Sequence, residues 1–151
     1  MDDSVLIIFG TETGNAEDVA VDIGNMASKH GLTGIVKDME DVSLEDLSSS
    51  KRLIVSISNW GEGEQPDNAQ LLYDEVECSD IESMRGVNYA VLALGDTAFE
   101  LFCESGKEWE RGWEEKGGTR VNRRIDWDTD YYDYVDEWIE TTLGMMRLLP
   151  S

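Results

Sequence analysis

The stretch "SVLIIFGTETGNAEDVA" (residues 4–20) joins an apolar run to a helical pattern through a short polar turn. The run at 4–9 is apolar without alternation, which is typical of a strand buried on both faces. From Ala16 onward, apolar residues recur at the spacing of one helical face, and this pattern ends near Gly31. The stretch therefore predicts a buried strand, a turn and an amphipathic helix, the first unit of an α/β fold.

The turn between this strand and helix has the chemistry of an anion site. The hydroxyls of Thr11 and Thr13 and the backbone N–H groups of residues 12–16 can converge on an anion at the helix N-terminus. The turn contains no Lys or Arg, and it matches neither the Walker A pattern nor the GxGxxG fingerprint. Hydroxyl and amide groups alone suit one terminal phosphate better than a polyphosphate with magnesium. Taken by itself, the turn is equally compatible with ordinary helix caps.

The rest of the chain repeats the alternation of strand and helix. Further strands are predicted at 33–39, 52–58, 88–95 and 120–127. Helices are predicted at 43–48, with Ser43 and Asp46 as a capping box, at 68–77, along a stripe from Phe102 to Trp113, and from Tyr131 to Met146. Five strands that alternate with helices predict a parallel sheet with right-handed crossovers and helices on both faces. We expect residues 1–151 to form a single domain.

The three most apolar strands lead into loops that would meet at one edge of the sheet. These loops read "GTETGN", "SNWGEGEQPDN" and "LGDTAFELFC", and open parallel sheets bind ligands beyond the carboxyl ends of their strands. Trp60 and Phe99 are placed to stack on the two faces of a planar ring, unless each packs under its own loop. Trp127, at the end of the last predicted strand, is a weaker candidate for the rim. A phosphate site beside an aromatic sandwich predicts a mononucleotide-like cofactor.

The net charge restricts the classes of partner. The chain has 33 acidic and 12 basic residues, and its formal net charge is -21. Such a surface repels nucleic acid and anionic membranes and attracts basic proteins, although it also suits simple solubility or a saline habitat. No apolar run reaches the roughly 18–20 residues of a membrane span, and the start "MDDSV" is unlike a secretion signal. We therefore expect a cytoplasmic protein with no nucleic-acid or membrane partner.

No catalytic or metal-binding set competes with the cofactor site. Cys78 and Cys103 form no CxxC pair, so we expect reduced thiols, and the only histidine, His30, falls at the end of the first helix. The acidic segment 126–137 has the ligand spacing of a calcium loop. Because Tyr131 stands where the sharp turn of such a loop needs Gly, we expect a solvated connection instead.

Together, the segments "TETGN", "SNWGEGEQPDNAQ" and "LGDTAFELFCESGKEWE" resemble the three FMN loops of flavodoxins. They are most similar to the FMN domains of diflavin reductases, among them sulfite reductase flavoprotein, and to short-chain flavodoxins of the MioC type. The resemblance covers essentially the whole chain. It implies a flavodoxin-like three-layer sandwich, with a five-stranded parallel sheet of order 2-1-3-4-5 and FMN as the cofactor.

The resemblance also assigns roles to residues in each loop. It implies that the FMN phosphate binds at Thr11, Glu12, Thr13, Gly14, Asn15 and Ala16, and that Trp60 and Phe99 flank the isoalloxazine ring. The ring edges and the ribityl chain would meet Ser58, Asn59, Gly61, Gly63, Leu94, Gly95, Asp96, Phe102 and Cys103. The chain departs from the family at Asn59, where Thr is usual, and at Phe99, where Tyr is usual. The second departure keeps the stacking and loses a hydroxyl.

The resemblance implies an electron carrier rather than an enzyme with catalytic residues of its own. The flavin performs the redox chemistry and the protein tunes it. Carboxylates in the same loops (Glu62, Glu64, Asp96 and Glu100) would disfavour the negative reduced ring and lower its potential. We expect a monomer that passes single electrons between basic-surfaced redox proteins, namely a ferredoxin- or flavodoxin-NADP reductase-like donor and an acceptor oxidoreductase.

Two other functions remain open on the sequence. One is an NAD(P)H/quinone oxidoreductase of flavodoxin fold, which usually needs longer loops or a partner subunit to form its second pocket. The other is an FMN domain excised from a larger diflavin reductase. A module that binds no flavin would leave Trp60 and Phe99 unexplained.

Overall fold

The computed structural model describes residues 4–10, 15–58, 72, 74–76, 78–79, 85–95, 111, 113–114, 116–122, 125–128 and 132–148. Its strands are β1 (Ser4–Gly10), β2 (Thr33–Asp38), β3 (Arg52–Ser58), β4 (Asn88–Gly95), β5 (Thr119–Arg120) and β6 (Ile125–Asp128). Its helices are α1 (Asn15–Lys29), the 3-10 turn η1 (Met39–Asp41), α2 (Leu44–Ser48) and α5 (Tyr132–Arg147). Within these ranges, no helix has the length and apolar character that crossing a bilayer requires.

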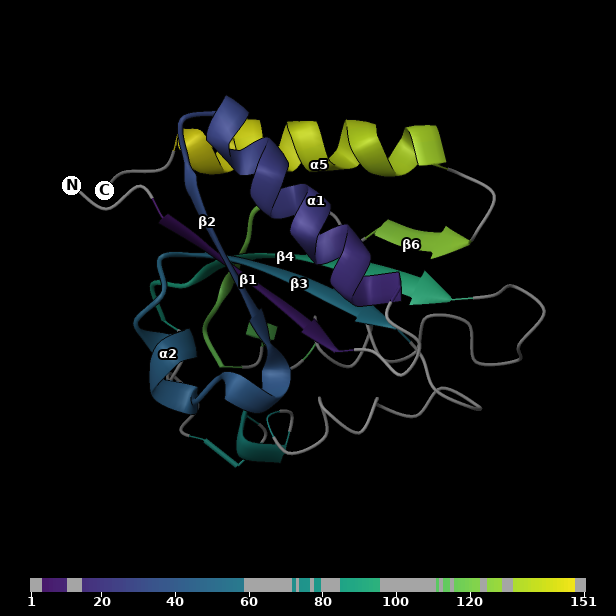
Figure 1. Ribbon diagram of the computed structural model, residues 1–151. Helices are drawn as coiled ribbons and strands as arrows, with labels where there is room; N and C mark the ends of the chain where they lie inside the picture. The colour runs from purple at the N-terminus through teal and green to yellow at the C-terminus, as the bar shows by residue number, and fades with distance from the viewer. Residues whose placement is uncertain are drawn as a thin grey trace.

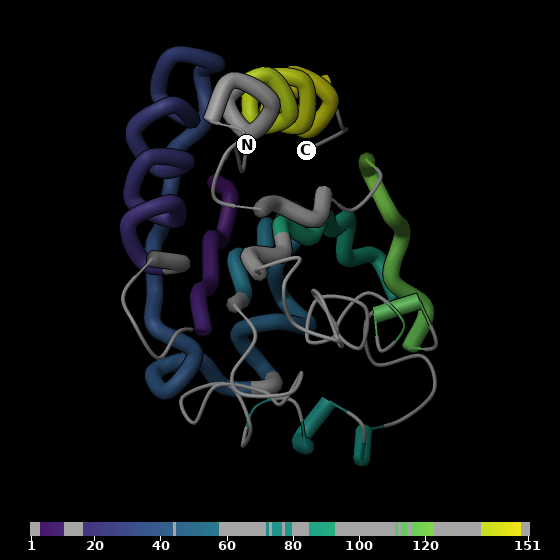
Figure 2. Tube along the Cα trace, turned by 90° about the vertical axis from the view of Figure 1, so that its right-hand side faces the viewer, coloured from purple at the N-terminus to yellow at the C-terminus, as the bar shows by residue number. Residues whose placement is uncertain are grey.

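The strands form one parallel sheet in the order β2-β1-β3-β4, with β5 and β6 both paired to β4. Helices α1 and α5 lie on one face, and α2 lies on the other (Figures 1 and 2). The parallel α/β architecture and the strand order 2-1-3-4-5 are therefore confirmed, with the fifth strand divided into two pieces.

The division of the fifth strand corrects the single strand predicted at 120–127. The backbone N–H of Val121 still donates to the carbonyl of Tyr89, but the chain bends at Val121 and Asn122. The side-chain amide of Asn122 donates to the hydroxyl of Thr142 in α5 at 3.0 Å. Thr142 is fully buried, and a buried hydroxyl needs a hydrogen-bond partner. A side-chain bond to α5 thus holds Asn122 at the point where the chain bends.

Several predicted boundaries are confirmed. The first helix ends at Lys29, and Gly31 follows with a positive φ of 76°, a conformation that glycine adopts without a steric penalty. The capping box at α2 is present, because Ser43 and Asp46 exchange backbone-to-side-chain hydrogen bonds of 3.0 and 3.1 Å. Of the helix predicted at 68–77, only residues 72 and 74–76 are described, and they are helical.

Alternating residues of the central strands supply two separate cores. In β1, Leu6 and Ile8 face the core on the α2 side, whereas Val5, Ile7 and Phe9 face the core under α1 and α5. Both sets are buried, as expected for strands of a parallel sheet covered on both faces. Each large aliphatic side chain so buried contributes roughly 1.5–3 kcal/mol to folding. Burial on both faces fixes the register of the central strands, because a slip by one residue would exchange the two sets.

Two glycines bring α1 close to the edge strand β2. A Cβ on Gly34 would stand 2.8 Å from the Cα of Gly24 and 3.0 Å from its carbonyl oxygen. These are backbone atoms of the facing helix, so they cannot move aside as a flexible side chain would. The absence of both side chains therefore sets the distance between α1 and β2.

We predict that Gly34→Ala lowers the free energy of unfolding by roughly 1–3 kcal/mol, because the added methyl group overpacks this contact. A matched control is Gly144→Ala in α5, where a Cβ meets no atom within 4 Å. This change should be neutral or stabilising by up to about 1 kcal/mol, since alanine is the better helix former. Urea unfolding of the two variants measures the difference. Equal stabilities would show that the close approach of α1 to β2 does not depend on glycine at position 34.

Candidate functional site

The carboxyl ends of four adjacent strands lie in register at one edge of the sheet. Gly10 of β1 pairs with Ile57, next to the final residue of β3, Ser58. Ser58 pairs with Leu94, and the last residue of β4, Gly95, pairs with Asp128 of β6. Neighbouring strands are about 4.8 Å apart, so the segments that follow β1, β3 and β4 start within roughly 10 Å of each other. The arrowheads of these strands lie on one side in Figure 1, the side that faces the viewer in Figure 2.

Helix α1 begins at this same edge. Its first residue, Asn15, follows the end of β1 after the four residues 11–14. The first N–H groups of a helix have no carbonyl partner within the helix, and the helix dipole makes this end positive. Two exposed carboxylates, Glu17 and Asp18, stand in the first turn. This edge therefore offers backbone N–H donors to an anion. The described residues in the first turn of α1 include no Lys or Arg.

The structure describes five of the predicted site residues, and it describes them through their backbone. Asn15 and Ala16 open α1, Ser58 ends β3, and Leu94 and Gly95 end β4, so all five border the same edge. The predicted positions that lie outside the described residues are Thr11, Glu12, Thr13, Gly14, Asn59, Trp60, Gly61, Gly63, Asp96, Phe99, Phe102 and Cys103. The described edge thus fixes where the three loops leave the sheet.

Strand β6 adds two positions to this edge that the sequence did not place firmly. Trp127 occupies the register position beside Leu94, and Asp128 occupies the position beside Gly95. The sequence treats Trp127 as a weak candidate for the rim and treats Asp128 as part of a solvated acidic connection. The predicted order 2-1-3-4-5 already places the last strand beside β4; what it does not give is the register that sets Trp127 against Leu94 and Asp128 against Gly95.

Charge is distributed unevenly along the strand direction. Most of the described lysines and arginines lie where strands begin or where helices end, at the amino edge of the sheet: Lys29, Lys51, Arg52, Arg85, Lys116, Arg120 and Arg147. The exceptions among described residues are Lys37 and Arg111. Carboxylates follow the strands at the opposite edge, in η1 and at the end of β6. Most described cations thus lie away from the edge that receives the three loops.

The described residues also offer no cluster of metal ligands at this edge. Among these residues, no three His, Cys, Asp or Glu side chains lie together as a metal site would require. Cys78 is an exposed free thiol.

The comparisons of this chain with known proteins agree on one family. The sequence model of the flavodoxin family matches residues 7–138. The sulfite reductase (NADPH) flavoprotein alpha-component of Bacillus subtilis is 35% identical over 139 residues, which are 92% of this chain and 23% of that protein. The chain thus spans about a quarter of the length of the curated relatives that it matches.

Solved structures of flavodoxins share the architecture. A flavodoxin from Streptococcus pneumoniae has a TM-score of 0.84 at 23% identity, over 95% of this chain and 97% of that one. Flavodoxin 1 from Bacillus cereus has a TM-score of 0.84 at 20% identity, over 97% of this chain and 99% of that one. At these identities, the two structures support the fold alone.

Proposed function

The chain belongs to the flavodoxin family, and on that premise we propose that it carries single electrons at low potential between redox proteins. FMN is the cofactor of this family. The observation that carries the proposal is the alignment of the ends of β1, β3 and β4, which lead into the three segments that resemble FMN loops. We take residues 1–151 as one FMN-binding domain of a cytoplasmic protein.

The donor chemistry at the start of α1 suits the phosphate of FMN. Asn15 and Ala16 supply the backbone of the first helical turn, where unpaired N–H groups and the helix dipole favour an anion. Thr11, Thr13 and Gly14 would add two hydroxyls and a close backbone approach. Because residues 11–16 include no Lys or Arg, the cradle suits a monophosphate better than a polyphosphate.

The ring of FMN would lie beyond the ends of β3 and β4. Ser58, Leu94 and Gly95 place the backbone there, and Trp60 and Phe99 follow in the adjoining loops. Bound FMN supplies the redox centre that accepts and releases electrons. The chain's own contribution is to hold the ring between aromatic side chains, to exclude water from its faces and to surround it with negative charge. Asp128, beside Gly95 in register, belongs to that negative surrounding, which lowers the potential.

The charge asymmetry supports a basic redox partner. The molecule is acidic overall, with a net charge of -21, and its described cations gather mainly at the edge away from the site. A basic donor or acceptor protein would therefore be steered to the cofactor edge first. An NADP reductase-like donor and an acceptor oxidoreductase fit this description.

A second possibility is an FMN domain that works within a larger reductase. The observation in its favour is the 35% identity to a sulfite reductase flavoprotein of which this chain covers only 23%. In that case the electron donor is a neighbouring domain. The FMN site would work in the same way in both cases. The two functions differ in the electron donor, which is a separate protein in the first and a neighbouring domain in the second.

Uptake and stepwise reduction of FMN test the proposed function. The purified chain should bind FMN, turn yellow, pass through a transient blue colour on stepwise reduction, and oxidise no NADPH unaided.

Thr13→Ala should weaken FMN binding by about tenfold or more, because hydrogen bonds to charged groups contribute about 1.5–3 kcal/mol. The matched control, Thr119→Ala at the amino edge, should leave binding unchanged. A chain that takes up no FMN contradicts the proposal, and direct oxidation of NADPH favours an oxidoreductase.

Salt dependence tests the nature of the partner. The rate of electron transfer from the reduced protein to a basic haem protein such as cytochrome c should fall several-fold as salt is added. The reason is that the Debye length shrinks from about 30 Å at 0.01 M to about 8 Å at 0.15 M ionic strength. Transfer to a small neutral quinone is the control and should not change. A salt-independent rate with cytochrome c would rule out steering by the acidic surface.

A further inference from the structure

The last strand of the sheet carries two extra residues between its two pieces. Along β4 the pairing advances by three positions, from Tyr89 to Leu92. Over the same interval the partner strand advances by five positions, from Arg120 at the end of β5 to Ile125 at the start of β6. Residues 121–124 therefore form a bulge against β4. A bulge bends its strand and redirects the residues that follow it.

The bulge decides which residues reach the carboxyl edge of the sheet. Trp127 and Asp128 occupy the register positions beside the last two residues of β4. A ladder that continued from β5 without extra residues would put Ile125 and Asp126 in those positions instead. The bulge thus brings an aromatic residue to the edge from which the three loops depart.

Burial explains why the extra residues are present. A straight ladder would place Arg123 beside Leu92, and Leu92 is fully buried in the core under α1 and α5. Paired positions of neighbouring strands face the same side of a sheet, and burying a cation without a partner is unfavourable. The pattern of burial therefore excludes the straight ladder. It does not fix the shape of the bulge, because four residues can span the interval in more than one way.

A side-chain hydrogen bond anchors the bulge to α5. The backbone N–H of Val121 still donates to the carbonyl of Tyr89 at 2.8 Å, so the ladder from β5 extends to this residue. At the next position, the side-chain amide of Asn122 donates to the hydroxyl of Thr142 at 3.0 Å. Asn122 is half-buried and Thr142 is fully buried. The bond therefore joins the bulge to the inner face of α5.

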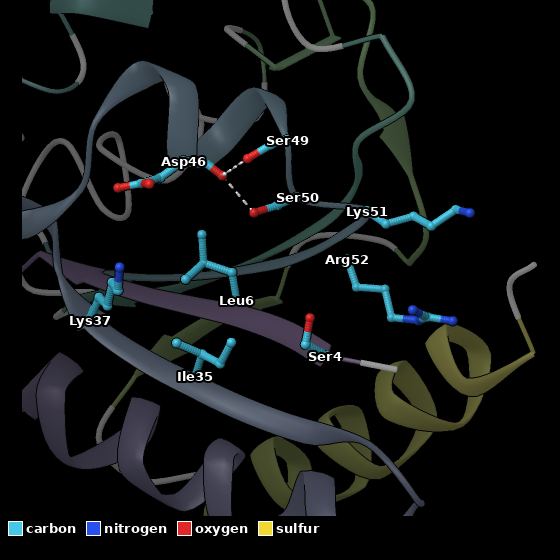
Figure 3. A pocket seen from close by; sticks show the side chains of 9 residues that line it. All are labelled: Ser4, Leu6, Ile35, Lys37, Asp46, Ser49, Ser50, Lys51 and Arg52. Carbon is cyan, nitrogen blue, oxygen red and sulfur yellow. Dashed lines mark hydrogen bonds between the residues drawn. The ribbon is translucent and has the colours of Figure 1, made fainter. Parts of the chain in front are cut away.

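Thr142 is a fixed anchor because α5 is itself held firmly against the sheet. Its neighbours Leu143 and Met146 are fully buried in the same core. The carbonyl of Met146 accepts a 2.8 Å hydrogen bond from the Nε–H of Arg52 in β3, a residue that is only 2% exposed. Figure 3 looks into a pocket that Arg52 helps to line and shows this side chain reaching the end of α5. Helix α5 thus presents its hydroxyl to the bulge from a constant position.

We propose that Asn122 is a positioning residue for the FMN site. Through its bond to Thr142 it holds the bulge in one shape and so fixes β6 beside the end of β4. The inference rests on the proposed function, because it assigns the end of β6 to the edge that binds FMN. Without the bond, Trp127 and Asp128 are less well ordered before FMN arrives, and binding must then supply that order.

FMN affinity and amide hydrogen exchange test this role. Asn122→Ala should weaken FMN binding by about three- to tenfold, the loss expected for one hydrogen bond. It should also speed amide exchange at residues 125–128 several-fold in the FMN-free protein. Thr142→Val removes the same bond from its other end and should have the same two effects, whereas Thr142→Ser keeps the hydroxyl and should match the wild type. The double variant Asn122→Ala/Thr142→Val should lose no more than either single variant, because the two residues act through one contact.

The matched control is Asn88→Ala at the amino edge. The side-chain amide of Asn88 donates to the carbonyl of Lys51 at 3.0 Å, and this residue is half-buried at the start of β4. Losing this bond should lower the thermal unfolding temperature about as much as Asn122→Ala does. It should leave FMN affinity and exchange at residues 125–128 unchanged. The comparison separates positioning of the site from a general loss of stability.

The opposing outcomes are distinct. A wild type that binds FMN while Asn122→Ala binds it equally well overturns the positioning role and leaves the proposed function standing. Unchanged exchange at residues 125–128 in Asn122→Ala also overturns it. An equal fall in FMN affinity in Asn88→Ala would assign the effect to lost stability alone. A wild type that takes up no FMN contradicts the proposed function, and the positioning role falls with it.

Discussion

The parallel hydrogen-bonded register of β1, β3, β4 and β6 is the constraint on which the rest of the structure depends. It brings Gly10, Ser58, Gly95 and Asp128 to one edge of the sheet, although these residues are far apart in the sequence. Burial on both faces fixes the register of the central strands, because a one-residue slip would send Leu6 and Ile8 to the wrong core. The loops that resemble FMN loops therefore start from fixed, adjacent points.

The same strand direction separates charge. Strands begin, and α1 and α5 end, at the amino edge, where most of the described Lys and Arg residues lie. Cations at helix C-termini also interact favourably with the helix dipole, so this arrangement helps the fold as well as the proposed function. Few described cations lie at the carboxyl edge, which suits a redox centre of low potential and a basic partner.

Much of the fold could be predicted from local pattern. The apolar run at 4–9, the helical periodicity that ends near Gly31 and the Ser43–Asp46 capping box each depend on neighbouring residues, and each is confirmed. Non-local contacts could not be predicted in this way. The bond from Asn122 to Thr142, at the bend in the fifth strand, joins residues 20 positions apart.

The same distinction applies to the candidate site. The residue types in the loops, with the resemblance, were enough to name the cofactor. The predicted strand order placed the last strand beside β4, but the register that sets Trp127 against Leu94 and Asp128 against Gly95 was not predictable from either segment.

The most direct test of the account is to locate FMN on the protein by amide NMR as the cofactor is added. The largest shifts are predicted at the carboxyl edge, at Asn15, Ser58, Leu94 and Gly95, with smaller ones at Trp127 and Asp128. The amides of Arg52, Asn88 and Thr119 at the amino edge should not move. Shifts that concentrate at the amino edge, or that spread evenly over the sheet, would contradict the central claim that the aligned strand ends form the FMN site.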